Sequence, residues 1–260
     1  MANSRFEYVK TFERNDALLP NTYIIVRIDG HAFHKFSAAH GFTKPNDLGA
    51  LALMNKAAAA VFDAFPEIQL AYGDSDEYSF LFPRSFNRYE RRESKLISTC
   101  ASVFTAAYIF RWSQHFPDTA MKYPPSFDAR AVLYPTGQNV RDYFSWRQAD
   151  CHINNLYNTT FWALIQNESK ENKPKLTNTE AQARLMHTFA KDKNEILFKE
   201  YGINYNNEDA ICRKGTVLFS DSNTHAMSNK ALDKRRKAGL SECHVDIIQD
   251  DFWLAHPDIL

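Results

Sequence analysis

The chain has 260 residues, of which 44% are hydrophobic and 24% charged, a composition typical of a globular protein with a substantial core. No apolar run approaches the roughly 20 residues of a membrane span, so no membrane partner is expected. The 31 basic and 31 acidic residues give a formal net charge of zero. Neutrality weighs mildly against a dedicated nucleic-acid binder, although phosphates respond to local basic surface rather than to the total charge.

The first residues and the cysteines indicate the cellular compartment. MANSRFEYVK carries charge and lacks the apolar stretch of a secretory signal. The four cysteines form no CxxC pair, which gives a zinc site little support. We therefore expect free thiols in a cytoplasmic protein, with a nuclear location left open.

The first predicted elements follow the order strand, helix, strand, strand. Thr22–Ile28 is β-branched and apolar and stops at Asp29, which predicts a buried strand. Asp47–Phe65 begins with a capping Asp and is rich in helix formers. Ile68–Pro83 predicts two strands around a tight turn.

The later elements mix helices with single strands. Patterns predict helices over Arg88–Phe116, Asn139–Trp146, His152–Gln166 and Thr179–Tyr201, and strands over Phe127–Pro135 and Gly215–Phe219. Ser220–Leu240 is polar, basic and aperiodic, so we expect it to be irregular. A βαββ unit with a later strand indicates an α+β fold, in which helices pack on a mostly antiparallel sheet.

Carboxylates gather where predicted strands end. Asp29 follows the first strand, and Asp74, Asp76 and Glu77 crowd the hairpin turn GDSDE. A decorated turn is the plain alternative. Repulsion among these charges favours a bound cation instead, and hard oxygen ligands favour magnesium over zinc. Two magnesium ions would suit an in-line phosphoryl displacement, while the chain lacks both GxxxxGK[ST] and GxGxxG.

Basic residues form two clusters that suit phosphates or, equally, a solvated surface. The cluster that follows the hairpin contains Arg84, Arg88, Arg91, Arg92 and Lys95. The cluster in the aperiodic segment contains Lys230, Lys234, Arg235, Arg236 and Lys237. In a βαββ layout Arg92 and Lys95 could face the carboxylate edge beside Lys44 and Ser75, where a triphosphate needs cations. An exposed helix face is the alternative for Arg92 and Lys95.

Several stretches together resemble the tRNA-His guanylyltransferase family of eukaryotes. They are DGHAFHKF (Asp29–Phe36), FTKPND (Phe42–Asp47), YGDSDEYSFLF (Tyr72–Phe82), Lys95–Tyr108, HINNLYNT (His152–Thr159), and NYNNE followed by RKGTVL (Asn204–Leu218). The heptapeptide HINNLYN is highly specific, and the resemblance covers nearly the whole chain.

The resemblance implies an activity and an architecture. The family adds a guanosine to the 5′ end of tRNA-His, using ATP to adenylylate the 5′-phosphate before the 3′-hydroxyl of GTP attacks. Members resemble the polymerase palm and assemble as homotetramers. For this chain, the resemblance implies a palm-like catalytic domain over residues 1–137 and a helical and irregular extension over 138–260, which together form one compact unit.

The resemblance also implies roles for individual residues. Two magnesium ions would be held by Asp29, Asp76 and the carbonyl of Gly30, with Glu77 in support. Nucleotides would be bound by His34, Lys44, Ser75, Arg92 and Lys95, with Phe42 and Asp47 near the base. Substrate would be positioned by His152, Asn155 and Asn158. We assign tRNA binding to the basic cluster Lys230, Lys234, Arg235, Arg236 and Lys237.

Two other functions fit parts of the pattern. A diguanylate-cyclase-like or conventional polymerase-palm enzyme would share the carboxylates, but the heptapeptide and the basic last third favour a tRNA substrate. A non-catalytic tRNA-binding or nucleotide-sensing module would have no need to keep three repelling carboxylates together.

Overall fold

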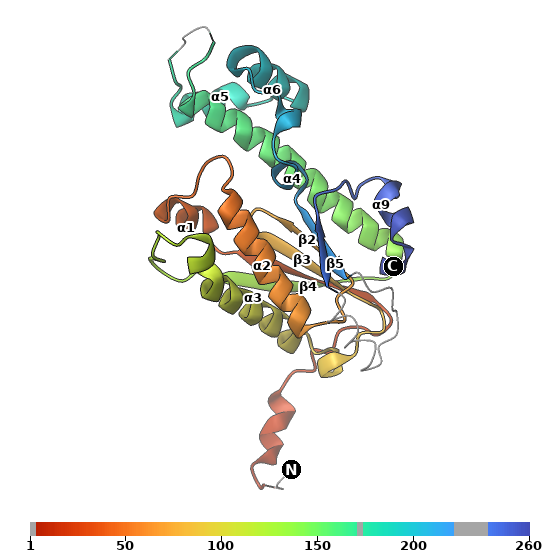
Figure 1. The fold of residues 1–260 in the computed structure, drawn as a ribbon. Helices are drawn as coiled ribbons and strands as arrows, with labels where there is room; N and C mark the ends of the chain where they lie inside the picture. Colours follow the sequence, from red (N-terminus) through yellow and green to blue (C-terminus); the bar gives the residue numbers. More distant parts are fainter. Residues whose placement is uncertain (1–3, 171–173, 221–238) are drawn as a thin grey trace.

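A six-stranded antiparallel sheet forms the centre of the molecule, seen in a computed structural model that describes residues 4–170, 174–220 and 239–260 (Figure 1). The strand order is β4-β1-β3-β2-β5-β6, and every neighbouring pair is antiparallel. The strands are β1 (Tyr23–Gly30), β2 (Leu70–Asp74), β3 (Glu77–Phe82), β4 (Phe127–Tyr134), β5 (Thr216–Ser220) and β6 (Leu240–Cys243).

Helices cover both faces of this sheet. The helices of the described ranges are α1 (Phe33–Ala39), α2 (Leu48–Ala64), α3 (Glu93–His115), α4 (Gly137–Gln166), α5 (Asn178–Leu185), α6 (Ala190–Ile196), α7 (Ala210–Lys214) and α9 (Asp250–Ala255). Shorter turns are η1 (Glu7–Phe12), η2 (Arg88–Arg91), η3 (Leu197–Tyr201), η4 (Tyr205–Asn207) and η5 (Pro257–Ile259). No helix in the described ranges is long and apolar enough to cross a membrane.

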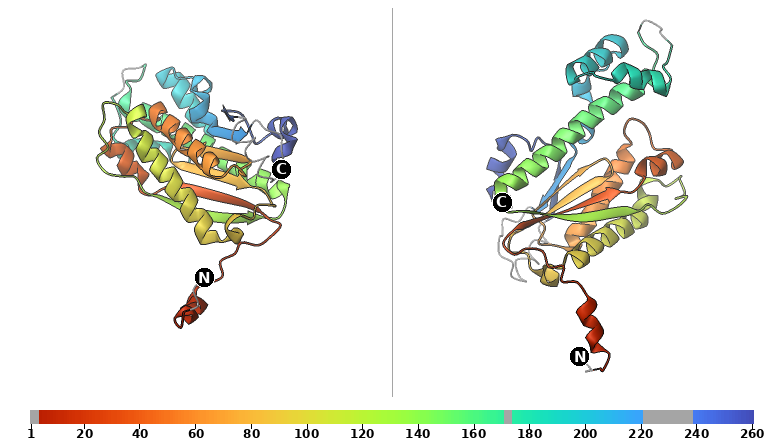
Figure 2. Two further views of the ribbon diagram at one scale, coloured as in Figure 1. Left: turned by 60° about the horizontal axis from the view of Figure 1, so that its bottom comes forward. Right: turned by 180° about the vertical axis from the view of Figure 1, so that it is seen from behind.

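Alternation along the strands explains the two layers. Ile24 and Val26 of β1 are fully buried in the large core under α2 and α3, whereas Ile25 between them packs in a smaller core on the α4 side. Figure 2 shows α2 and α3 on one face and α4 crossing the other. Helix α4 continues past the sheet and carries α5 and α6 at its outer end, while η1 projects away from the sheet (Figures 1 and 2).

The sequence prediction of helices on a mostly antiparallel sheet is confirmed, and the palm likeness stays a prediction. Strands β5 and β6 come from the second predicted domain, yet they extend the same sheet as β1 to β4. The division at residue 137 stays a prediction.

Four predicted helices are wrong in their extent. The helix predicted from Arg88 begins at Glu93, because Tyr89, Glu90 and Arg91 have positive φ angles. The buried Arg91 guanidinium holds this bend by donating to five backbone carbonyls from two neighbouring segments. That contact also removes Arg91 from the basic surface that the sequence suggested.

The other errors lie in the second half and next to β1. The two helices predicted on either side of Arg147 are one continuous helix, α4. The sequence pattern does not reveal this, because the polar residues near Arg147 are buried and interrupt the helical spacing of apolar residues. The helix predicted over Thr179–Tyr201 breaks at His187, which has a φ of 62°. Helix α1 and strand β6 were not predicted. Both are short, and β6 depends on pairing with β5.

Candidate active site

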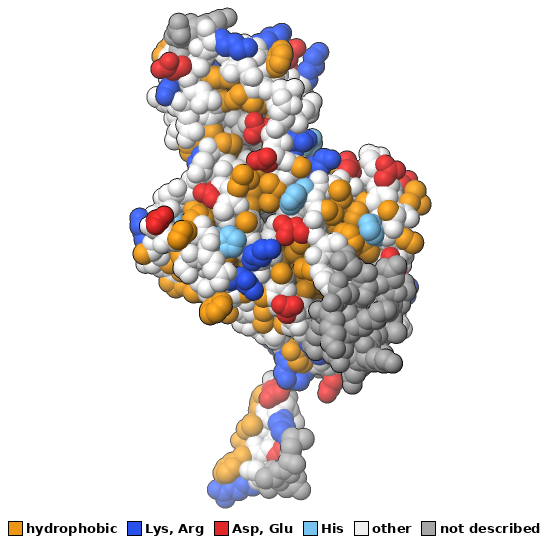
Figure 3. All heavy atoms as spheres, viewed as in Figure 1, with side chains coloured by type: hydrophobic (Ala, Val, Ile, Leu, Met, Phe, Trp, Pro, Cys, Tyr) orange, Lys and Arg blue, Asp and Glu red, His pale blue; other side chains and the backbone are white. Residues whose placement is uncertain are grey.

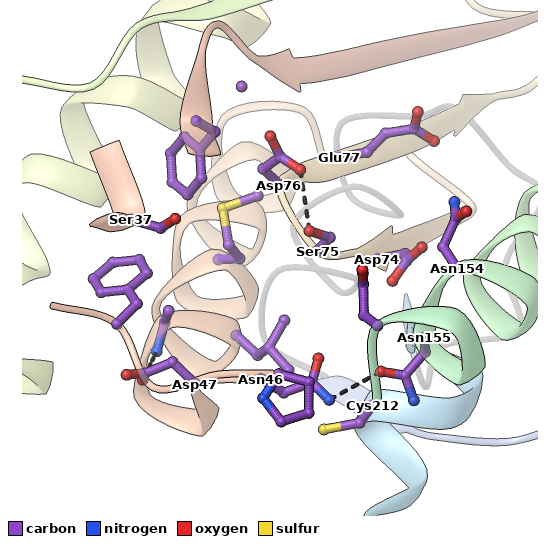
Figure 4. Close-up of a pocket in the computed structure, with 18 of the residues that line it drawn as sticks. Ser37, Asn46, Asp47, Asp74, Ser75, Asp76, Glu77, Asn154, Asn155 and Cys212 are labelled. Atoms are coloured by element: carbon purple, nitrogen blue, oxygen red, sulfur yellow. Dashed lines mark hydrogen bonds between the residues drawn. The ribbon is translucent and has the colours of Figure 1, made fainter. Parts of the chain in front are cut away.

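A cavity of about 580 Å³ opens where β1 ends, between the sheet, the start of α2 and one face of α4 (Figure 4). The sheet side supplies carboxylates from β1 and from the β2–β3 turn. The opposite side is a row of α4 residues spaced three or four apart, which places them on one helical face: Arg147, Asp150, Cys151, Asn154, Asn155, Asn158 and Trp162.

The predicted carboxylates converge on this cavity. Asp29 is directly paired with Glu77 across β1 and β3, and Asp76 occupies the turn before Glu77. The backbone N–H of Gly30 donates to the Asp76 carbonyl oxygen at 3.1 Å. A Cβ on Gly30 would lie 2.9 Å from the Asp76 Oδ2 atom, so only glycine allows the carboxylate to approach the end of β1 so closely.

Burial raises the pKa of three of these acids. It raises the pKa of Asp76, which the neighbouring Asp29 charge raises further, and it raises the pKa of Asp74 to about 7. Burial also raises the pKa of Glu77, opposed by ion pairs to Arg147 at 3.2 Å and Arg27 at 3.6 Å. Glu77 therefore has cations of its own, whereas Asp76 lies beside the Asp29 charge and has only partial compensation from the Ser75 hydroxyl, which donates to it at 3.1 Å, and from His34.

The donor set suits magnesium. No group of three or more His, Cys, Asp or Glu side chains in the described ranges lies close enough to hold a metal without other ligands. Magnesium does not need one, because it binds through one or two carboxylates and keeps water and substrate phosphates as its other ligands. Asp29, Asp76 and the Gly30 carbonyl are hard oxygen donors, and a cation would relieve the repulsion that raises the Asp76 pKa.

Five further predicted residues line the cavity, four of them near α1 and the start of α2 and the fifth, Ser75, in the β2–β3 turn. Lys44 Nζ donates to the Ser37 hydroxyl at 3.1 Å, and Asp47 caps α2 by accepting from the backbone N–H of Thr43 and of Ala50, both at 2.9 Å. The five are His34, Phe42, Lys44, Asp47 and Ser75. Phe42 is largely core, stacked 5.1 Å from Phe116.

The heptapeptide contributes the far side of the cavity. Asn155 is buried, accepts a hydrogen bond from Asn46 Nδ2 at 2.9 Å and donates to the Tyr205 hydroxyl at 2.9 Å. This chain joins the loop before α2 to α4 and to η4. Asn158 lines the cavity, whereas His152 does not and instead bonds a backbone carbonyl through Nδ1.

Arg92 and Lys95 do not reach this cavity within one chain. They follow β3, which runs from Glu77 at the cavity to Phe82 at the opposite end of the sheet. Arg92 bridges to Ala17, which precedes β1 at that same end. Strand length places the two cations roughly 20 Å from Asp29. The prediction that they face the carboxylate edge is therefore wrong, because β3 carries the chain away from it.

The predicted tRNA-binding cluster, Lys230, Lys234, Arg235, Arg236 and Lys237, lies outside the described residues. Other cations are visible at the outer tip of the molecule, where Lys and Arg side chains gather around α5 and α6 (Figure 3). Exposed members of that tip include Lys175 and Lys191.

Sequence reasoning missed several cavity residues, among them Asn46, Asn154, Arg147 and Trp162. A continuous α4 would have revealed the last two, because Arg147, Asn155, Asn158 and Trp162 share one face only if the helix is unbroken. Nothing in the sequence pattern pairs Asn46 with Asn155, which lie 109 residues apart.

An antiparallel sheet that presents neighbouring carboxylates to a cavity rimmed by a lysine and several amides suits an enzyme that carries out displacements at phosphorus. Comparison with known proteins gives the family. Residues 6–135 match the tRNAHis guanylyltransferase family, and residues 138–249 match the family described as Thg1 C terminal domain. The tRNA(His) guanylyltransferase of Schizosaccharomyces pombe is 53% identical, over 99% of this chain and 97% of that one.

Solved structures agree with this assignment. The crystal structure of the Saccharomyces cerevisiae tRNA(His) guanylyltransferase has a TM-score of 0.77 and 47% identity, covering 83% of this chain and 93% of that one. A bacterial Thg1-like protein in complex with ATP has the same fold, with a TM-score of 0.73 at 23% identity over 98% of this chain and 97% of that one. The chain belongs to the tRNA-His guanylyltransferase family and is a nucleotidyltransferase.

Proposed function

We propose that this enzyme adds a guanosine to the 5′ end of tRNA-His, growing the RNA in the 3′ to 5′ direction. The observation that carries the proposal is the convergence of Asp29 and Asp76 on one cavity beside Lys44. Family membership supports the reaction, and bacterial Thg1-like proteins have been seen in complex with ATP and with GTP.

The proposed reaction has two displacements at phosphorus. A 5′-phosphate oxygen of the tRNA attacks the α-phosphorus of ATP and pyrophosphate leaves, which gives an adenylylated 5′ end. The 3′-hydroxyl of GTP then loses its proton and attacks the 5′-phosphorus, so that AMP leaves. Pyrophosphate is finally removed from the new 5′ end. Both displacements need negative charge to be neutralised at the same place.

The side chains of the cavity suit separate tasks in this scheme. Asp29, Asp76 and the Gly30 carbonyl would hold two magnesium ions, which would supply charge neutralisation and activate a hydroxyl. Lys44 and Ser37 offer an ammonium and a hydroxyl to phosphate oxygens. Glu77 keeps Arg147 against the sheet rather than serving as a ligand itself.

Arg92 and Lys95 fit the scheme only through a second copy of the chain. If they bind a triphosphate, as the family resemblance implies, they must do so in the cavity of a neighbour, since their own lies roughly 20 Å away. The expected homotetramer would provide such a neighbour.

The test uses 5′-monophosphorylated tRNA-His transcript, magnesium, ATP and labelled GTP. We expect label on the tRNA, with AMP released only when ATP and the 5′-phosphate are both present. Dephosphorylated tRNA and the Asp76→Ala variant are the controls. Cyclic dinucleotide formation without tRNA would favour a cyclase, and tRNA binding with no transfer would favour a non-catalytic module.

A further inference from the structure

Trp162 has surroundings unlike those of the chain's other three tryptophans. Trp112 and Trp253 are buried, and each indole N–H donates to a backbone carbonyl, at 2.6 and 2.8 Å. Trp146 is exposed and its ring lies 3.4 Å from the Arg147 guanidinium carbon. Trp162 is only partly buried, lines the cavity, and within the described ranges has no acceptor for its indole N–H. Tryptophan normally satisfies that group when it is structural.

Packing does not account for this indole either. The neighbouring Phe161 turns into a hydrophobic cluster with Tyr157 and Ile165, while Trp162 belongs to none of the clusters found among the described residues. Its only described ring contact is an edge against Phe161, with ring centroids 5.6 Å apart. One flat apolar face is therefore available to the cavity.

The position of Trp162 along α4 separates it from the carboxylates. It lies fifteen residues after Arg147, which contacts Glu77, so the two points are about 22 Å apart along the helix axis. A stacked nucleic-acid strand advances 3.4 Å per nucleotide, so this length corresponds to several nucleotides. A single nucleotide with its phosphates at Asp29 and Asp76 would leave the indole end uncovered.

We propose that Trp162 is a stacking platform for a base of the RNA strand whose 5′ end lies at the carboxylates. The inference rests on the proposed function and deepens it by assigning the outer part of the cavity to the RNA. Asn158 and Asn154, about one and two turns before the indole, are exposed neutral amides that can donate to and accept from base edges and ribose hydroxyls. Stacking on an indole tolerates any base, because every base has a π face.

The test measures tRNA binding in the absence of ATP and GTP, so that it does not depend on catalysis. Trp162→Ala should weaken tRNA binding about five- to a hundredfold, the usual effect of losing one stacked base. Trp162→Phe keeps a flat ring and should stay within about threefold of the parent. Phe110→Ala, which removes an 80% exposed aromatic ring from α3 outside the cavity, is the matched control and should bind normally.

Tryptophan fluorescence identifies the contact directly. Stacking of a base on Trp162 should quench part of the emission of the parent protein when tRNA is added, and Trp162→Phe should lose that quench while keeping its affinity. A quench that persists in Trp162→Phe overturns the proposal, because the base would then lie elsewhere.

Two further outcomes overturn it. If Trp162→Ala weakens binding of GTP or ATP and not of tRNA, the indole serves the base of the mononucleotide. If it lowers the thermal midpoint while every ligand binds normally, the indole is structural. If Trp162→Ala binds tRNA normally and the parent enzyme transfers guanosine, this inference is rejected and the proposed function stands. If the parent enzyme transfers no guanosine to tRNA-His, the proposed function is rejected.

Discussion

The two walls of the cavity are built on different chemical principles. The sheet wall carries Asp29, Asp74 and Asp76 on strand ends, where burial and mutual repulsion raise the pKa values of Asp74 and Asp76. The α4 wall carries neutral amides such as Asn155, whose hydrogen bonds are satisfied within the protein. A cation would relieve the repulsion in the sheet wall, whereas Asn155 in the α4 wall already has partners for its amide. We infer that the sheet wall does the chemistry and the α4 wall positions the substrate.

One ion pair joins the two walls. Arg147 from α4 reaches Glu77 at 3.2 Å, and its side chain is 9% exposed. A pair so shielded from water is weakly screened, so it fixes the spacing between the walls more firmly than a surface pair would.

The largest effect is expected on the sheet wall. Asp29→Ala and Asp76→Ala should each lower the single-turnover rate of both displacements by about a thousandfold or more, because both steps use the same charge-neutralising groups. Rapid quench with ATP, and separately with a tRNA that is already activated, measures the two rates. Asp63→Ala, an exposed carboxylate on α2, should leave both unchanged. A near-normal rate in either step would reject the assignment.

A second effect concerns stability and pH. The pKa of Asp74 is raised to about 7 by burial, with further contributions from Glu77, Asp76 and Asp150. At about pH 3 and below Asp74 is largely protonated whether the chain is folded or unfolded. As pH rises to 7 the unfolded chain releases that proton first, so the folded state loses stability.

Asp74→Asn should remove this loss, and should therefore stabilise the metal-free protein at pH 8 by between about 1 and 4 kcal/mol. At about pH 3 the variant and the parent should unfold alike. Urea unfolding at the two pH values measures the difference. Added magnesium should reduce the gain, because a cation near the carboxylates favours their charged form. Equal stabilisation at both pH values would mean that packing, not titration, explains the variant.

A third effect tests whether the far cations act on a neighbouring copy. Lys95, at the start of α3, and Asp76, at the β2–β3 turn, lie toward opposite ends of the sheet. If Lys95 acts on the cavity of a neighbouring copy, a mixed oligomer of Lys95→Ala and Asp76→Ala would contain some cavities with both residues intact. Mixing the two variants after unfolding and refolding together should raise guanylyl transfer about tenfold or more over either alone. Asp29→Ala mixed with Asp76→Ala is the control and should stay inactive, because both changes damage the same wall. No recovery in the first mixture would reject action between copies.

The difference between the sheet wall and the α4 wall also explains which parts of the site could be predicted from the sequence. The carboxylate edge follows from local patterns, because Asp29 and Asp76 mark the ends of an apolar strand and a hairpin, and pairing of β1 with β3 then brings them together. Arg92 was misplaced because its neighbourhood in sequence suggested a neighbourhood in space, while β3 intervenes. The Asn46–Asn155–Tyr205 bonds join residues more than 100 positions apart at their widest, and only the packing of α4 across the sheet creates them.

The smallest effect is expected where the α4 wall is anchored. Tyr205→Phe removes the hydroxyl that accepts from Asn155 Nδ2 and leaves that amide donor buried without a partner. Burial raises the pKa of Tyr205 to about 12, so the hydroxyl keeps its proton across the working pH range. We expect unfolding to become easier by about 1 to 2 kcal/mol, a KM for substrate raised by less than about fivefold, and an unchanged kcat.

Tyr157→Phe is the matched control for this variant. Tyr157 lies on α4 and packs against a hydrophobic cluster, and its hydroxyl makes no hydrogen bond within the described ranges. Its stability should change by less than about 0.5 kcal/mol. Urea unfolding and steady-state kinetics with GTP and tRNA varied independently measure both variants. A large fall in kcat for Tyr205→Phe would show that the amide wall takes part in the displacements, and the division between a reacting wall and a positioning wall would then be wrong.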